Sequence, residues 1–205
     1  PNQMIISGAI AYAIAATPAL YQPIFGTPLK WVAMFAPLVF AMVFSFRFDR
    51  MSLSGAYACL WGFAGVMGIS MASILLVFTG ASIANTFFIA ASMFLTVSLW
   101  GYTTRTDLTR WSSFLVMGVI GVVIASLVNL FLQSGPLQMV ISIVGVIAFT
   151  GLTAWDTQRA KSEYLAYGSG VASEKLAVMS AFSLYLNFVN IFQLLLQFTG
   201  VQKSE

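Results

Sequence analysis

Charged residues are so sparse in this chain that five long segments contain none. Lys and Arg number nine and Asp and Glu six among 205 residues. The uncharged segments are residues 1–29, 31–46, 51–104, 111–155 and 176–202. A membrane-spanning helix needs about 20 mostly apolar residues, and a charge near its centre costs about 2.5–3.5 kcal/mol. The pattern therefore predicts a polytopic membrane protein.

Composition excludes several functional classes. Hydrophobic residues make up 60% and charged residues 7%, whereas soluble domains are roughly 25% charged. The basic residues are too few and scattered to bind nucleic acid. Histidine is absent and Cys59 is the only cysteine, so we expect no disulfide within the chain, no cofactor and no enzymatic activity. The start at Pro1 suggests that further residues precede it.

Seven membrane segments are expected in one all-α domain, residues 1–205. They cover residues 4–20, 31–46, 53–78, 82–102, 111–132, 137–157 and 176–198. The breaker sequence QSGP at residues 133–136 separates the fifth and sixth segments. We expect the only sizeable polar loop to lie between Arg159 and Lys175. Small residues at Gly62, Gly65 and Gly68 indicate close helix packing.

The basic residues predict the orientation of the chain. Seven lie in loops on one side: Arg47, Arg50, Arg105, Arg110, Arg159, Lys161 and Lys175. Only Lys30 and Lys203 lie on the other. The positive-inside rule then places the N-terminus in the cytoplasm and, with seven crossings, the C-terminus outside. Six crossings, or a last segment that enters and returns, would place the C-terminus in the cytoplasm.

The last segment carries a stripe of polar side chains. At about 100° per residue, six of them fall within a sector of about 140°: Ser180, Ser183, Asn187, Asn190, Gln193 and Gln197. Lipid would disfavour this face, so it should point into the bundle. Hydrogen bonding between helices and the lining of a wet cavity are equally open interpretations. A shorter stripe of Ser126, Asn129 and Gln133 is a plausible partner.

Asp156 is the only acid in or near a predicted segment. It lies at the cytoplasmic end of the sixth segment, where the helix dipole disfavours a carboxylate, so a donor or cation should lie nearby. Arg159, three residues later, can supply the cation. An ordinary interfacial acid and a cation-binding or proton-sensitive gate are both compatible with this position.

Four motifs in the second part of the chain match a known pattern. They are GYTTRTDL at 101–108, SLVNLF at 126–131, FTGLTAWDTQ at 149–158 and LYLNFVNIF at 184–192. They resemble motifs of the bacterial branch of the Bax inhibitor-one family, also called the transmembrane Bax inhibitor motif proteins. Trp155 stands where that family usually has Tyr. The resemblance implies a seven-helix bundle with a central C-terminal helix.

The resemblance also implies a function. Family members are described as calcium-leak channels that respond to pH through two aspartates sharing a proton, one in each of the last two motifs. Asp156 matches the first aspartate, but Asn187 replaces the second. Because Asn has no titratable proton, we expect a gate at Asp156 and Asn187, with Asn190 and Arg159 on the ion pathway, that keeps its hydrogen bond and loses its proton switch. Asp156 alone would bind Ca²⁺, and weakly.

A second function belongs to a different class. The resemblance is also compatible with a regulatory protein of the bacterial cytoplasmic membrane that transports nothing and binds a membrane protease or another regulator. Such a role would depend on the cytoplasmic loops or termini and would not need Asp156. The sequence therefore predicts a membrane protein in contact with lipid, whose other partner is Ca²⁺, another cation or a protein.

Overall fold

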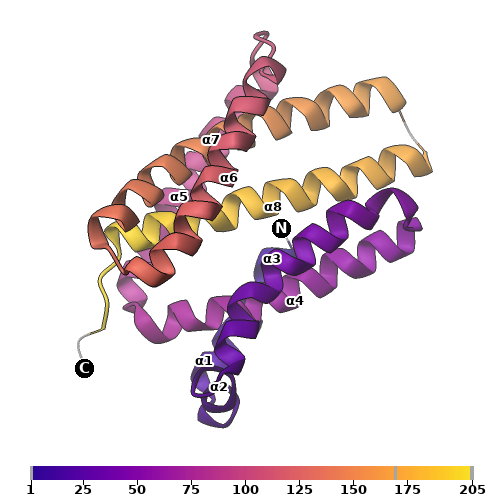
Figure 1. The fold of residues 1–205 in the computed structure, drawn as a ribbon. Helices are drawn as coiled ribbons and strands as arrows, with labels where there is room; N and C mark the ends of the chain where they lie inside the picture. The colour runs from indigo at the N-terminus through magenta and orange to yellow at the C-terminus, as the bar shows by residue number, and fades with distance from the viewer. Residues whose placement is uncertain (1, 169, 204–205) are drawn as a thin grey trace. The chain divides into compact units, whose positions relative to one another are not determined.

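The computed structural model describes residues 2–168 and 170–203, which form helices joined by short connections (Figure 1). The helices are α1 (Asn2–Ala16), α2 (Pro18–Phe25), α3 (Leu29–Arg47), α4 (Leu53–Val77), α5 (Gly80–Thr103), α6 (Thr109–Leu132), α7 (Gly135–Tyr167) and α8 (Val171–Thr199), with a 3-10 turn at Phe48–Arg50. Six helices are long and apolar enough to cross a membrane, and α1 with α2 would make a seventh, broken span. The prediction of an all-α membrane protein is confirmed.

The first predicted segment, residues 4–20, is broken. α1 and α2 meet at an angle of 94°. The break follows from Pro18, because a proline disfavours the helical conformation of the residue before it. Thr17 accordingly adopts an extended backbone, with φ −116° and ψ 103°. A hydropathy pattern alone did not predict this bend.

The prediction of a polar loop between Arg159 and Lys175 is wrong. α7 continues to Tyr167 and α8 begins at Val171. Residues 158–167 include three charged side chains, but most of the ten are Gln, Arg, Ala, Lys, Glu or Leu, which are strong helix formers. The helix therefore continues beyond the residue at which the hydrophobic pattern ends. α7 ends at Gly168, whose φ of 63° lies in the left-handed region that favours glycine.

The chain groups into two compact units, residues 1–80 with 202–205 and residues 81–201. In the first unit, α4 packs against α1 and α3. Ser7 donates to the carbonyl oxygen of Ala64 at 2.8 Å, and a Cβ on Gly68 would lie 2.8 Å from the carbonyl oxygen of Ser7. Gly62 and Gly65 have no comparably close neighbour. Only Gly68 of this glycine trio is thus required by the packing.

The C-terminal tail is fixed within the first unit. Lys203 donates its backbone N–H to the carbonyl of Val77 at 2.9 Å and its Nζ to the carbonyl of Leu75 at 2.7 Å. Gln202 also forms an antiparallel bridge with Phe78. A cation at the C-terminal end of α4 is favoured by the helix dipole. Gln202 and Lys203 therefore lie beside the C-terminal end of α4.

In the second unit, α8 runs alongside α7 (Figure 1), and α7 also packs on α6. Phe188 of α8 makes edge contacts with Phe87 and Phe94 of α5, with ring centres 5.7 and 5.5 Å apart. α8 has the largest buried share of the candidate spans, as expected for a central helix. By contrast, Phe131 of α6 is 89% exposed, which suits a surface in contact with lipid.

The crossing of α5 and α7 depends on Gly101. A Cβ at this position would overlap the backbone of Ala154, and backbone atoms cannot move aside as a flexible side chain can. We expect Gly101→Ala to lower the unfolding temperature by several degrees, measured in detergent. Gly121→Ala is the matched control, because nothing lies within 4 Å of its Cβ position. Equal behaviour of the two variants would contradict the crossing.

Candidate functional site

Asp156 is held inside the second unit by groups from two helices. The residue is 4% exposed. Asn187 of α8 donates its Nδ2 to Asp156 Oδ2 at 2.8 Å, and Arg159 Nη2 lies 3.3 Å from Oδ1. Each carboxylate oxygen thus has a partner, as a buried charge requires. The structure brings together three of the four residues that the sequence proposed for the pathway.

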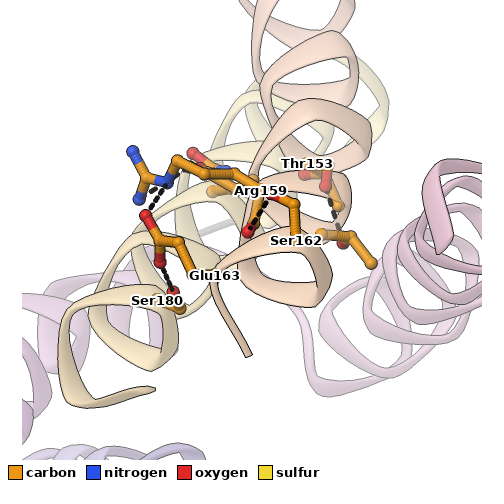
Figure 2. A network of polar contacts seen from close by, with 8 residues as sticks. Thr153, Arg159, Ser162, Glu163 and Ser180 are labelled. Atoms are coloured by element: carbon orange, nitrogen blue, oxygen red, sulfur yellow. Dashed lines mark hydrogen bonds and ion pairs between the residues drawn. The ribbon is translucent and has the colours of Figure 1, made fainter. Parts of the chain in front are cut away.

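Arg159 links this contact to a second acid, Glu163 (Figure 2). Arg159 Nε lies 3.6 Å from Glu163 Oε1, and the Ser180 hydroxyl lies 3.5 Å from Glu163 Oε2. The guanidinium also lies 4.8 Å from the ring centre of Trp155, which is cation–π geometry. Sequence reasoning missed Glu163. Its spacing of four residues from Arg159 and seven from Asp156 places all three on one helix face.

The polar stripe of α8 does not make one continuous chain of contacts. Ser180 and Asn187 are buried, whereas Gln197 is exposed. Asn190, the fourth proposed pathway residue, donates to the carbonyl of Leu186 on its own helix at 2.8 Å. The contacts of the stripe with α7 are thus separate from one another, at Ser180, Asn187 and Gln197.

The end of the stripe farther from Asp156 contacts a group of amides. Gln138 of α7 donates to Gln197 of α8 and accepts from Asn129 of α6 at 3.1 Å. Asn129 therefore pairs with α7 and not directly with the α8 stripe. Ser126 donates to its own helix at Val122, and Gln133 is the left-handed residue that ends α6, with φ 47°. The shorter stripe predicted on the fifth segment does not act as a unit.

Gln158 and Lys161 hold the connection between α5 and α6 against α7. Gln158 accepts from the Leu108 backbone at 2.9 Å and donates to the Thr106 carbonyl at 2.8 Å. Lys161 donates to the Tyr102 carbonyl at 2.8 Å. The turn of α7 that carries Asp156 thus also anchors this loop.

Within the loop, the Thr109 backbone N–H donates to Asp107 at 2.9 Å. This bond lowers the pKa of Asp107 below its ordinary value. The ionised carboxylate is favourable beside the N-terminus of α6, where the helix dipole is positive.

Loss of the Gln158 clamp should loosen this loop. Gln158→Leu removes both bonds to the loop backbone, so trypsin should cleave several-fold faster after exposed Arg105. Timed proteolysis of the purified protein measures the rate. Ser162→Ala is the matched control, since that hydroxyl donates to the Arg159 carbonyl of its own helix and to no loop residue among those described. Unchanged cleavage of the Gln158 variant would show that the loop is held elsewhere.

Over residues 2–168 and 170–203, no group of three or more His, Cys, Asp or Glu side chains is arranged to hold a metal ion. Asp156 and Glu163 are the two carboxylates around Arg159. This arrangement offers oxygen ligands of the type that hard cations prefer, but too few for a tight resident site.

Comparison with known proteins identifies the family. The family model described as inhibitor of apoptosis-promoting Bax1 matches residues 2–204. An uncharacterized protein of Rickettsia prowazekii is 44% identical over 98% of this chain and 85% of its own length. The inner membrane protein YbhL of Escherichia coli is 34% identical over 96% of this chain and 86% of its own. This multi-pass membrane protein therefore belongs to the bacterial branch of the Bax inhibitor-one family.

Proposed function

We propose that this protein is a passive leak for cations, Ca²⁺ above all, across the bacterial cytoplasmic membrane. The observation that carries the proposal is the buried carboxylate of Asp156, which an amide of α8 and a guanidinium of α7 hold between them. Ionisable groups inside membrane proteins are costly and commonly mark ion pathways. The protein makes and breaks no covalent bond in this role and uses no cofactor.

The contact between Asp156 and Asn187 acts as the closure. It ties α7 to α8 through one bond of 2.8 Å, and hydrogen bonds to a charged group contribute about 1.5–3 kcal/mol. Separation of the two side chains frees a carboxylate oxygen for a cation. The Asn187 amide donates a hydrogen bond but does not titrate, so this closure should respond only weakly to pH.

Cation flux from vesicles that contain the purified protein tests this function. Asp156→Asn removes the charge that attracts the cation, so we expect Ca²⁺ flux to fall by about tenfold or more. Asp107→Asn is the matched control, because Asp107 is an exposed acid in the α5–α6 loop and should leave flux unchanged. Equal flux through the Asp156 variant and the parent protein would contradict the proposal.

We further propose that the N-terminus faces the cytoplasm and the C-terminus the outside. Lys203 lies at the C-terminal end of α4, and this end of the helix is the outer one in the seven-crossing arrangement. Because Cys59 is the only cysteine, a Cys59→Ala background permits single-cysteine labelling in intact cells. An impermeant thiol reagent should label Gln202→Cys and leave Asn2→Cys unmodified. The reverse pattern would invert the topology.

A regulatory role is the second candidate, and the α5–α6 loop favours it. Gln158 and Lys161 hold this loop in one conformation, in which Arg105, Asp107 and Arg110 are exposed. A fixed, charged loop suits recognition by a membrane protease or another protein. If Asp156→Ala leaves the cellular phenotype intact while Arg105→Ala with Arg110→Ala abolishes it, partner binding is the function.

A further inference from the structure

A groove lies between α3 and α4, which run side by side in the first unit (Figure 1). Its volume is about 600 Å³, and its lining is almost entirely apolar. Seven side chains of α3 line it, together with Met51 and Cys59. Sites that bind small molecules typically measure about 300–1,000 Å³. The groove is therefore large enough for a ligand, and it suits an apolar one.

Aromatic contacts fix the wall that α3 contributes. The ring of Phe40 lies 5.6 Å from the ring of Phe63 on α4, and the ring of Phe35 stacks on Trp31 at 6.3 Å. On α4 the lining side chain is Cys59, which is small and leaves the space between the helices open. The groove is thus already formed without a ligand, as most binding sites are.

Two arginines lie at one end of this groove. Phe40, Val43 and Arg47 are spaced by three and four residues, so they share one face of α3. Arg47 therefore continues the lining face beyond the groove. Arg50 directly precedes Met51, which lines the groove, and both arginines are exposed. An apolar channel consequently leads to a cationic, solvent-accessible end.

We propose that this groove binds one acyl chain of an anionic phospholipid and that Arg47 and Arg50 contact its phosphate. The lining on α3 extends from Val32 to Phe44, which is about 18 Å along the helix axis. One leaflet is about 15 Å deep, half of the 30 Å hydrocarbon core. Basic groups between helices at the membrane surface are known to recognise anionic headgroups. The leak function is not needed for this binding.

The charge of the turn between α3 and α4 sets the strength of the preference. Asp49 lies between the two arginines, so residues 47–50 carry a net charge of +1. The first turn of α4 contains no acidic residue, and the positive end of its helix dipole adds to the attraction for a phosphate. We therefore expect anionic lipid to be preferred over zwitterionic lipid by about tenfold.

Cys59 can report occupancy of the groove, because it is the only cysteine and lines the groove. In the purified full chain, phosphatidylglycerol should slow alkylation of Cys59 by N-ethylmaleimide at about tenfold lower concentration than phosphatidylcholine with the same acyl chains. Arg47→Gln with Arg50→Gln should remove this difference. Arg105→Gln with Arg110→Gln is the matched control, because it removes two exposed arginines from the α5–α6 loop and should preserve the difference.

Filling the groove gives a second measurement. Native mass spectrometry should show one phosphatidylglycerol retained by the parent protein and several-fold less retained by Ala36→Phe, because Ala36 lines the groove. Ala58→Phe adds the same ring at an exposed position of α4 outside the lining, so it should retain as much lipid as the parent. The arginine variants change exposed side chains and provide the test if Ala36→Phe fails to fold.

Three results would overturn the proposal. Equal protection of Cys59 by both lipids would mean that the headgroup is not recognised. Loss of the difference in the Arg105 and Arg110 variant as well would mean that the overall charge of the protein attracts the lipid. Protection that rises with protein concentration and not with lipid would assign the groove to a second copy of the chain. Selective protection that depends on Arg47 and Arg50 supports the site, whether or not vesicles pass Ca²⁺.

Discussion

Replacing Asn187 with aspartate should give this protein a steep response to acid. Asn187 Nδ2 lies 2.8 Å from Asp156 Oδ2, so an aspartate at position 187 would place two carboxylates in contact. Two carboxylates that close cannot both be ionised without a large energetic cost, so the pair would share a proton. In the proposed leak, a shared proton would form a bond between α7 and α8 and so close the pathway. We expect Ca²⁺ flux through Asn187→Asp to fall by up to about tenfold per pH unit as the pH drops.

The measurement is flux from vesicles over roughly pH 6–8, where the parent protein should change little because it has no histidine and no carboxylate pair at this contact. Asn190→Asp is the control for an added acid elsewhere, since Asn190 bonds to its own helix at Leu186. A parent protein that already closes steeply in acid would show that another group senses protons. An Asn187→Asp variant as insensitive as the parent would remove the basis for the closure.

Truncating Phe188 should cause the largest loss of stability. Its side chain is 6% exposed and contacts the rings of Phe87 and Phe94 on α5. Within a membrane, helices associate mainly through such packing. We therefore expect Phe188→Ala to lower the free energy of unfolding by about 3 kcal/mol, in the range typical of buried aromatic truncations.

Unfolding in mixed micelles, followed by tryptophan fluorescence, would give the size of this loss. Phe131→Ala is the matched control, because Phe131 is 89% exposed and should lose little in a detergent belt. A loss below about 1 kcal/mol for Phe188→Ala would mean that α5 is held to α8 by other contacts. The neighbouring Asn187 allows a further check, since a loosened α8 should also raise basal flux.

The sequence predicts the spans well because hydrocarbon penalises every charge in them. The uncharged runs end near Arg47, Arg105 and Arg110, and α3, α5 and α6 begin or end at or near the same residues. Avoidance of lipid also predicts that the polar stripe faces the interior of the bundle, and these inferences depend on the solvent alone. The pairing of Asp156 with Asn187 was expected from the family resemblance.

Features that depend on backbone conformation or on long-range contacts were missed. The apolar run ends before Glu163, whereas residues with high helix propensity continue past it. The hydropathy pattern therefore predicts a loop at Glu163, where the structure has helix α7. The bend at Pro18 lies within an apolar run and leaves the hydropathy unchanged. The clamp formed by Gln158 joins residues 50 and 52 positions apart, and a single sequence does not specify such pairs.

The length of α7 sets the electrical depth of the site. Its 33 residues extend about 50 Å, while the hydrocarbon core is about 30 Å thick. Asp156 lies 21 residues after Gly135, or about 32 Å along the axis, and Glu163 lies two turns beyond it. In the proposed leak, an ion that enters from the Gly135 end would cross most of the transmembrane voltage before it reaches Asp156, whereas an ion from the other end would cross little of it. Access to Asp156 should consequently depend strongly on the membrane potential from the Gly135 end and weakly from the other end.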